Sequence, residues 1–160
     1  MRPAMLAAAF LFIASTGSAQ FRRQRSRSGS SADLAAVELS PLQGLGKVSL
    51  GRCPAARCLY VYVTPWCGFC RKATPLIKSL QSELKFKGLP MRVIVGDDRE
   101  DKIRSYAAEL GRDTLLDPEK KIRANGVPYL FMTDKQGKVI RSRQGMPDDL
   151  DEAVAWATER

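Results

Sequence analysis

Two cysteines with two residues between them, Cys67 and Cys70, are the side chains in this sequence best suited to chemistry. They follow an apolar run over residues 59–63 and precede a segment with helical spacing, so we expect the pair at the start of a helix. Unpaired backbone N–H groups and the helix dipole favour a thiolate on Cys67 there. Because a thiolate is the species that attacks disulfides, the spacing indicates a redox dithiol. The pair alone would also fit half of a zinc site or a static disulfide.

A second pair, Cys53 and Cys58, lies just before the same apolar run. A strand over residues 59–63 would hold the two pairs roughly 20 Å apart, at about 3.3 Å per residue. We therefore expect Cys53 and Cys58 to form a local structural disulfide, while a second redox couple, free thiols or a metal site stay open as alternatives. A zinc site that used all four cysteines would need ligands from both ends of a strand.

The chain contains 160 residues, four cysteines and no histidine. The length and an apolar content of 44% suit one domain with one core. The absence of histidine excludes Cys/His proteases, His-ligated metal sites and a dithiol tuned by an imidazole. No metal and no cofactor are expected.

The first 19 residues have the pattern of an export signal. An apolar run over residues 4–14 follows Arg2, and small residues suited to signal peptidase end at Ala19. The run is too short to span a bilayer, which takes about 20 residues. We expect residues 1–19 to be a signal peptide and the mature protein to be periplasmic or otherwise extracytoplasmic. Arginines just after the run keep an uncleaved membrane anchor and an organellar address open.

Residues 20–32 combine arginine and serine without apolar periodicity, which predicts a disordered tether. Five of the 26 basic residues and none of the 17 acidic ones lie in residues 1–32, so the net charge of +9 falls to +4 in the remainder. Nucleic-acid binding is therefore not expected. The arginine run fits a solvated linker or a contact with an anionic membrane surface. Residues 33–58 are expected to form an N-terminal extension that carries the second cysteine pair.

After residue 59 the patterns alternate between strand and helix. Apolar runs over 59–63 and 91–95 predict buried strands, and helical spacing follows over 69–86 and 99–110. This order predicts a parallel pair joined by a crossover helix, with a kink at Pro75. Further elements expected are a short helical turn over 117–122, a hairpin over 129–132 and 139–142, and a last helix from residue 147. The fold class is α/β, with a central mixed sheet flanked by helices.

The sequence over residues 59–160 resembles the thioredoxin family. The features that carry this resemblance are an apolar strand ending in Trp66-Cys67-x-x-Cys70, a proline five residues later (Pro75), and a Gly-Val-Pro segment at 126–128 before the hairpin and last helix. The resemblance implies a thioredoxin-like fold. The segments 115–118 and 131–140 look more like the exported, TlpA-like and cytochrome-maturation branch than the cytosolic one.

The resemblance also implies roles for individual residues. Pro128 is expected to be cis and to face the dithiol, and Val127 to pair with a substrate peptide. Trp66 and Gly126 are expected to line the same substrate-binding surface. Cys67 would attack a substrate disulfide, and Cys70 would then resolve the mixed disulfide. Arg71 and Lys72 could favour the thiolate or simply form a solvated helix face.

Two positions depart from the thioredoxin pattern. Val61 stands where thioredoxin has a buried acid that transfers a proton, and Phe69 stands where it has a proline between the cysteines. Without the acid, fast proton transfer from Cys70 loses its usual partner. Without the proline, the sequence does not place the reduction potential of the dithiol within the family's range, from about −270 mV to about −120 mV.

These observations predict an extracytoplasmic thiol-disulfide oxidoreductase that exchanges the Cys67/Cys70 couple with protein substrates, more as a reductase than as an oxidase. The partners expected are proteins with thiols or disulfides and a membrane or soluble redox partner, with the chain acting as a monomer. The alternatives are a disulfide oxidase or isomerase, a non-enzymatic thioredoxin-fold binding module, and a metal carrier.

Overall fold

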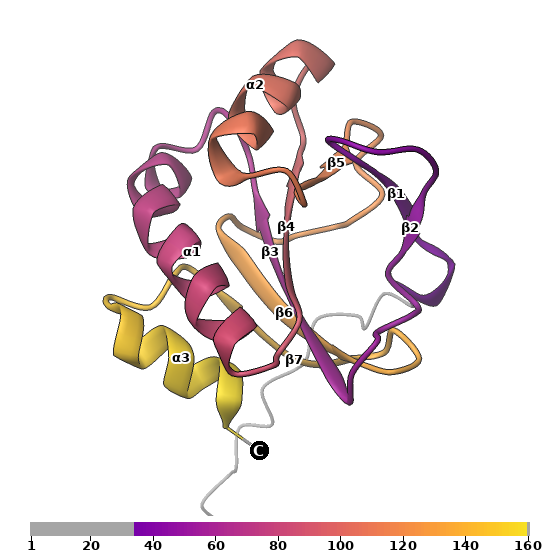
Figure 1. Cartoon of the computed structure of the whole chain (residues 1–160). Helices are drawn as coiled ribbons and strands as arrows, with labels where there is room; N and C mark the ends of the chain where they lie inside the picture. The colour runs from indigo at the N-terminus through magenta and orange to yellow at the C-terminus, as the bar shows by residue number, and fades with distance from the viewer. Residues whose placement is uncertain (1–33, 160) are drawn as a thin grey trace, which may run out of the picture.

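A computed structural model describes residues 34–159 of the chain. The predicted signal peptide over 1–19 and the predicted tether over 20–32 lie outside these residues. The described chain forms one seven-stranded sheet with the strand order β2-β1-β5-β4-β3-β6-β7 (Figure 1). None of its helices is long and apolar enough to cross a membrane.

Two short strands precede β3, and strands and helices alternate from β3 to β5. In chain order they are a 3-10 helix at Leu34–Ala36, β1 at Glu38–Pro41, β2 at Val48–Ser49, β3 at Arg57–Val63, α1 at Gly68–Phe86, β4 at Met91–Gly96, α2 at Glu100–Leu110, β5 at Leu115–Asp117, β6 at Tyr129–Asp134, β7 at Val139–Gln144 and α3 at Leu150–Thr158.

Strand β3 is the centre of the sheet, as its apolar sequence predicts. It pairs in parallel with β4 and antiparallel with β6, and six of its seven residues are buried. Strand β4 continues in parallel to β5, and β6 turns back into β7. The predicted α/β class with a central mixed sheet is confirmed.

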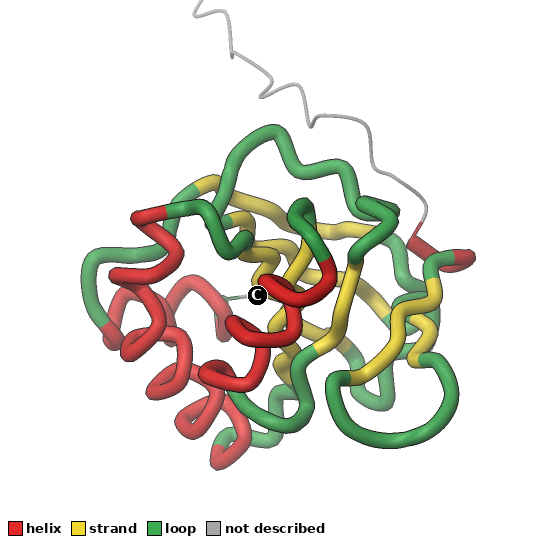
Figure 2. Tube along the Cα trace, turned by 90° about the horizontal axis from the view of Figure 1, so that it is seen from above, coloured by secondary structure: helices red, strands yellow, loops and turns green. Residues whose placement is uncertain are grey.

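All three helices cover one face of this sheet. The parallel connections β3-α1-β4 and β4-α2-β5 advance across the sheet in the same direction, and right-handed crossovers therefore place α1 and α2 on the same side. Figure 2 shows the helices gathered on one side of the strands, with only the short turn Leu34–Ala36 on the other. Their core contains Ile77 and Leu80 of α1, Ile103 of α2 and Ala153 of α3.

The opposite face of the sheet is covered by the chain before β3 instead of by an α-helix. Leu34, Leu39 and Leu50 form a second buried cluster with Tyr60 of β3 and Phe131 of β6. Strand β1 joins the sheet by antiparallel pairing with β5, and β2 pairs with β1 at the edge. The segment 34–56 thus adds two strands to the same sheet and builds a core on its second face.

The predicted short helical turn over residues 117–122 is wrong. Asp117, the first residue of this range, is the last residue of β5, which pairs with β4, and the chain then turns without a helix. The Asp117 carboxylate accepts hydrogen bonds from the backbone N–H groups of Lys121 (2.8 Å) and Ile122 (3.0 Å). Because the side chain takes these donors, the turn is closed without a helical ladder.

Candidate functional site: a dithiol at the start of α1

Cys67 is the residue that caps the N-terminus of α1. Its backbone is extended (φ −81°, ψ 110°), and its Sγ accepts a hydrogen bond from the backbone N–H of Cys70 at 3.1 Å. The N–H of Cys67 donates to the carbonyl of Thr64 at 3.3 Å, which closes the turn between β3 and α1. A sulfur that accepts a backbone N–H at a helix N-terminus is well placed to carry negative charge.

Cys70 lies one turn inward and is fully buried. Burial, and next the hydrogen bond with Cys67, raise the pKa of the Cys70 thiol to about 12. The two cysteines thus have different surroundings: Cys67 lies at the helix end and Cys70 lies in the core. This difference suits Cys67 to react with a substrate disulfide and Cys70 to attack the Cys67 sulfur afterwards.

The prediction that Cys67 is exposed is wrong, because only 5% of its surface is accessible. The carbonyl oxygen of Val127 lies 3.6 Å from its Sγ and accepts a hydrogen bond from the thiol. The loop that carries Val127 therefore covers the sulfur. Cys67 is still the more accessible of the two cysteines.

The loop over residues 126–128 is held against the dithiol by the β6-β7 hairpin. The Val127–Pro128 peptide bond is cis, as the resemblance implies, and the Pro128 carbonyl accepts a hydrogen bond from the N–H of Gly145 at 2.8 Å. Gly126 packs against the side chain of Gln144, which a Cβ on Gly126 would approach to 3.3 Å. The structure therefore brings the Val127 carbonyl into direct contact with the Cys67 sulfur.

Two aromatic side chains are exposed beside the dithiol. Trp66 is 61% exposed and Phe69 is 77% exposed, although both flank a buried sulfur. The Trp66 indole N–H donates to the carbonyl of Asp97 at 2.8 Å, which fixes the ring. Trp66, Gly126 and Val127 line a small cavity of about 210 Å³, next to the loop that covers Cys67. A fixed, exposed aromatic ring next to a reactive group offers a partner protein an apolar contact.

Helix α2 braces the first turn of α1 through a contact that the sequence did not reveal. The Tyr106 hydroxyl donates to the Cys70 carbonyl at 2.8 Å and lies 3.0 Å from the Thr74 hydroxyl. The Arg71 guanidinium stacks 4.0 Å from the centre of the Tyr106 ring and forms an ion pair with Glu109 at 2.8 Å. Arg71 is thus engaged by α2. A tyrosine on the apolar face of a predicted helix was the only signal of this contact.

Val61, six residues before Cys67, stands where thioredoxin has a buried acid. It is fully buried and belongs to the same apolar cluster as Cys70. Within residues 34–159, no three His, Cys, Asp or Glu side chains are grouped so that they could hold a metal ion.

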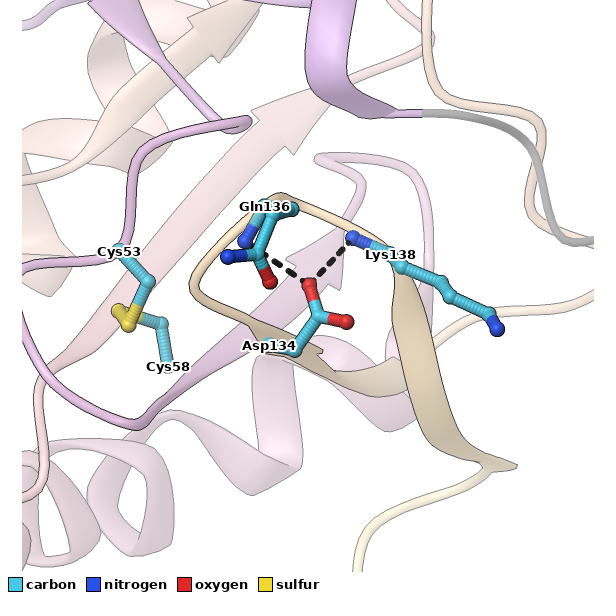
Figure 3. The surroundings of a disulfide bond; sticks show 5 residues. All are labelled: Cys53, Cys58, Asp134, Gln136 and Lys138. Carbon is cyan, nitrogen blue, oxygen red and sulfur yellow. Dashed lines mark hydrogen bonds between the residues drawn. A yellow bond between two sulfur atoms is a disulfide. The ribbon is translucent and has the colours of Figure 1, made fainter.

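The second cysteine pair lies at the other end of β3. Cys53 and Cys58 form a disulfide with a Cα–Cα distance of 5.7 Å. Figure 3 shows it near the β6-β7 turn, in which the Asp134 carboxylate accepts hydrogen bonds from the N–H groups of Gln136 (2.9 Å) and Lys138 (3.0 Å). Since Cys58 is the second residue of β3 and Cys67 follows its end, the length of the strand separates the two pairs.

No protein-family model and no curated protein matches this chain. Solved structures do match. The exposed lipoprotein thioredoxin Etrx1 of Streptococcus pneumoniae aligns with a TM-score of 0.60 and 18% identity over 78% of this chain and 98% of that one. StoA of Bacillus subtilis aligns with a TM-score of 0.60 and 16% identity over 77% and 96%.

A putative thiol:disulfide interchange protein DsbE of Chlorobium tepidum aligns with a TM-score of 0.56 and 21% identity, over 76% of this chain and 92% of that one. These alignments span nearly the whole of each matched structure and include the N-terminal part of the described chain. The chain therefore has the thioredoxin-like fold.

Proposed function

We propose that this protein is an extracytoplasmic thiol-disulfide oxidoreductase that exchanges its Cys67/Cys70 couple with protein substrates. The observation that carries the proposal is the Cys67 sulfur, which caps α1 through the Cys70 N–H at 3.1 Å and lies 3.6 Å from the Val127 carbonyl. A substrate chain that approaches this loop would bring its own sulfur to Cys67.

The exchange proceeds in two steps. The Cys67 thiolate attacks a substrate disulfide, one substrate sulfur leaves as a thiolate, and a mixed disulfide forms. Cys70 then loses its proton and attacks the Cys67 sulfur, which releases the second substrate sulfur and leaves a Cys67–Cys70 disulfide. Two electrons pass to the substrate, and the reverse sequence would oxidise a substrate dithiol.

We assign the reducing direction and a location outside the cytoplasm. The residue patterns at 115–118 and 131–140 support this, as do the descriptions of matched structures as an exposed lipoprotein and a thiol:disulfide interchange protein. The chain would act as a monomer, with a membrane or soluble redox protein restoring its dithiol. Phe69, in place of a proline between the cysteines, favours an oxidase or isomerase as the second candidate.

Trapping of mixed disulfides tests the proposal. In a Cys70→Ser variant, reduced Cys67 should form a stable mixed disulfide with a disulfide-bonded protein substrate such as insulin. The mixed disulfide persists because the variant has no second sulfur to resolve it. The matched Cys67→Ser variant should trap nothing, since Cys70 is fully buried. Trapping through Cys70 alone would reverse the roles, and trapping through neither would favour a binding module. A measured potential against glutathione then separates reductase from oxidase.

A further inference from the structure

A cavity of about 460 Å³ opens at the end of the sheet opposite the dithiol. Its walls come from the start of β3, the last turns of α1, the loop before β4 and the segment that holds Cys53–Cys58. Its volume is in the range of sites that hold small molecules, about 300 to 1,000 Å³. Its lining residues include Arg52, Pro54, Cys58, Leu59, Lys85, Leu89, Met91, Arg92 and Asp113.

The sheet itself explains why this space is open. Within β4, only Ile94–Gly96 pair with β5. The first half of β4 therefore pairs with β3 on one edge and has no strand of the described chain on its other edge. The chain before β3, which contributes Val48, Arg52 and Pro54, forms the wall of the cavity beside this unpaired edge. The Cys53–Cys58 disulfide closes this segment beside the cavity and limits its freedom to collapse inward.

The charges around the cavity are unbalanced. Three cations line it, Arg52, Lys85 and Arg92, and none of them forms an ion pair within residues 34–159. The single lining acid, Asp113, is likewise unpaired there. Lys87, two residues beyond Lys85 and not among the lining residues, forms an ion pair with Glu83 at 3.3 Å.

Apart from these charged residues and Gln81, the wall is mostly apolar. Leu59 is fully buried, and Leu89 and Met91 are half-buried at the cavity. Arg92 is half-buried as well, and its charge acts on the neighbouring Tyr60, whose pKa burial raises. Cations at the edge of an apolar pocket suit a ligand with an apolar body and an anionic head.

We propose that this cavity binds an amphiphilic anion, with Arg52, Lys85 and Arg92 holding its carboxylate or other anionic head group and the apolar wall receiving its body. This site is separate from the dithiol and does not depend on the proposed function. The head group could belong to a free amphiphile or to an anionic lipid, and the test distinguishes these sources.

Fluorescence titration of the full chain with 8-anilinonaphthalene-1-sulfonate, an apolar anion, tests the proposal. We expect saturable binding at one site that weakens with added salt. Lys85→Gln and Arg92→Gln should each weaken the affinity about fivefold, the value of one charge near 4 Å in water. The control Lys87→Gln removes the same charge from the same helix end outside the cavity and should leave the affinity unchanged. An unchanged far-UV circular dichroism spectrum and a cooperative thermal transition in each variant show that it is folded.

Competition identifies the source of the head group. Displacement of the probe by dodecanoate supports a free amphiphile. Displacement by phosphatidylglycerol vesicles and not by dodecanoate supports a lipid, provided that Arg92→Gln weakens it. Acetate has the head without the body and should not compete. Three results would overturn the proposal: equal effects of Lys85→Gln and Lys87→Gln, unchanged affinity in Arg92→Gln, or displacement by neither amphiphile.

Discussion

Resolution of the mixed disulfide by Cys70 should be strongly pH-dependent. Burial raises the pKa of this thiol from 9.0 to about 12, so the thiol stays protonated at neutral pH and its thiolate fraction grows about tenfold per pH unit as the pH rises. At pH 7 the fraction is about 10⁻⁵, compared with about 10⁻² for an unshifted thiol. Burial of Cys70 persists when Cys67 is part of a mixed disulfide, so Cys70 should react much more slowly there than an unshifted thiol of equal nucleophilicity.

A disulfide that releases a coloured thiol allows the attack by Cys70 to be measured separately. Reaction with Ellman's reagent joins thionitrobenzoate to Cys67 and releases one equivalent, and attack by Cys70 then releases a second. The rate of the second release should rise with a slope near one in log units from about pH 6 to about pH 9, because the largest cause of the shift, burial, persists in the mixed disulfide. A plateau near neutral pH would refute the reasoning, because it would reveal a base that accepts the Cys70 proton.

A variant at Val61 provides the complementary test. Val61→Asp places a carboxylate in the apolar cluster that contains Cys70, and it should speed the second release at pH 7 by at least about tenfold. The control Val61→Asn has the same shape without a base and should give no increase. Both variants should be less stable than the wild type, since they bury a polar group. Equal rates for the two variants would show that this position lacks access to Cys70.

Three further changes have defined outcomes. Serine at both Cys53 and Cys58 should lower the free energy of unfolding in denaturant by about 2 kcal/mol, the value for a loop with a sequence separation of 5, with insulin reduction retained; unchanged stability with lost activity would instead identify a second redox centre. Tyr106→Phe removes the hydroxyl that donates to the Cys70 carbonyl, so it should cost about 1 kcal/mol of stability and change the Cys67/Cys70 potential against glutathione; an unchanged potential would restrict Tyr106 to packing. Trp66→Ala should raise KM for insulin more than for a small disulfide, because the ring is 61% exposed beside Cys67; equal increases would contradict a role in docking.

Local patterns predicted the elements that carry the dithiol. Strand β3 and helix α1 follow from a continuous apolar run and a helical repeat, and both signals lie within short windows of sequence. The cis bond before Pro128 followed from the resemblance and is present in the structure. The signal peptide and the tether remain predictions.

The elements that sequence reasoning missed depend on partners far along the chain. Strands β1 and β2 are four and two residues long, too short to show alternation, and β1 exists because it pairs with β5 more than 70 positions later. Residues 117–122 form no helix because the Asp117 carboxylate accepts the N–H groups of Lys121 and Ile122, and the sequence pattern does not show these hydrogen bonds. The burial of Cys67 by Val127 and the contact of Tyr106 with Cys70 join separate elements, and no local pattern reports such a contact.

The two faces of the sheet have a practical consequence for anyone who trims this protein. Resemblance to thioredoxin begins at residue 59, which suggests an expression boundary just before β3. A chain cut there would lose the layer over the helix-free face and expose Tyr60, Ile94 and Phe131 to water. It would also free the edge of β5 that β1 occupies. An exposed apolar face beside an open strand edge invites self-association, so the shortest soluble fragment should begin near Leu34.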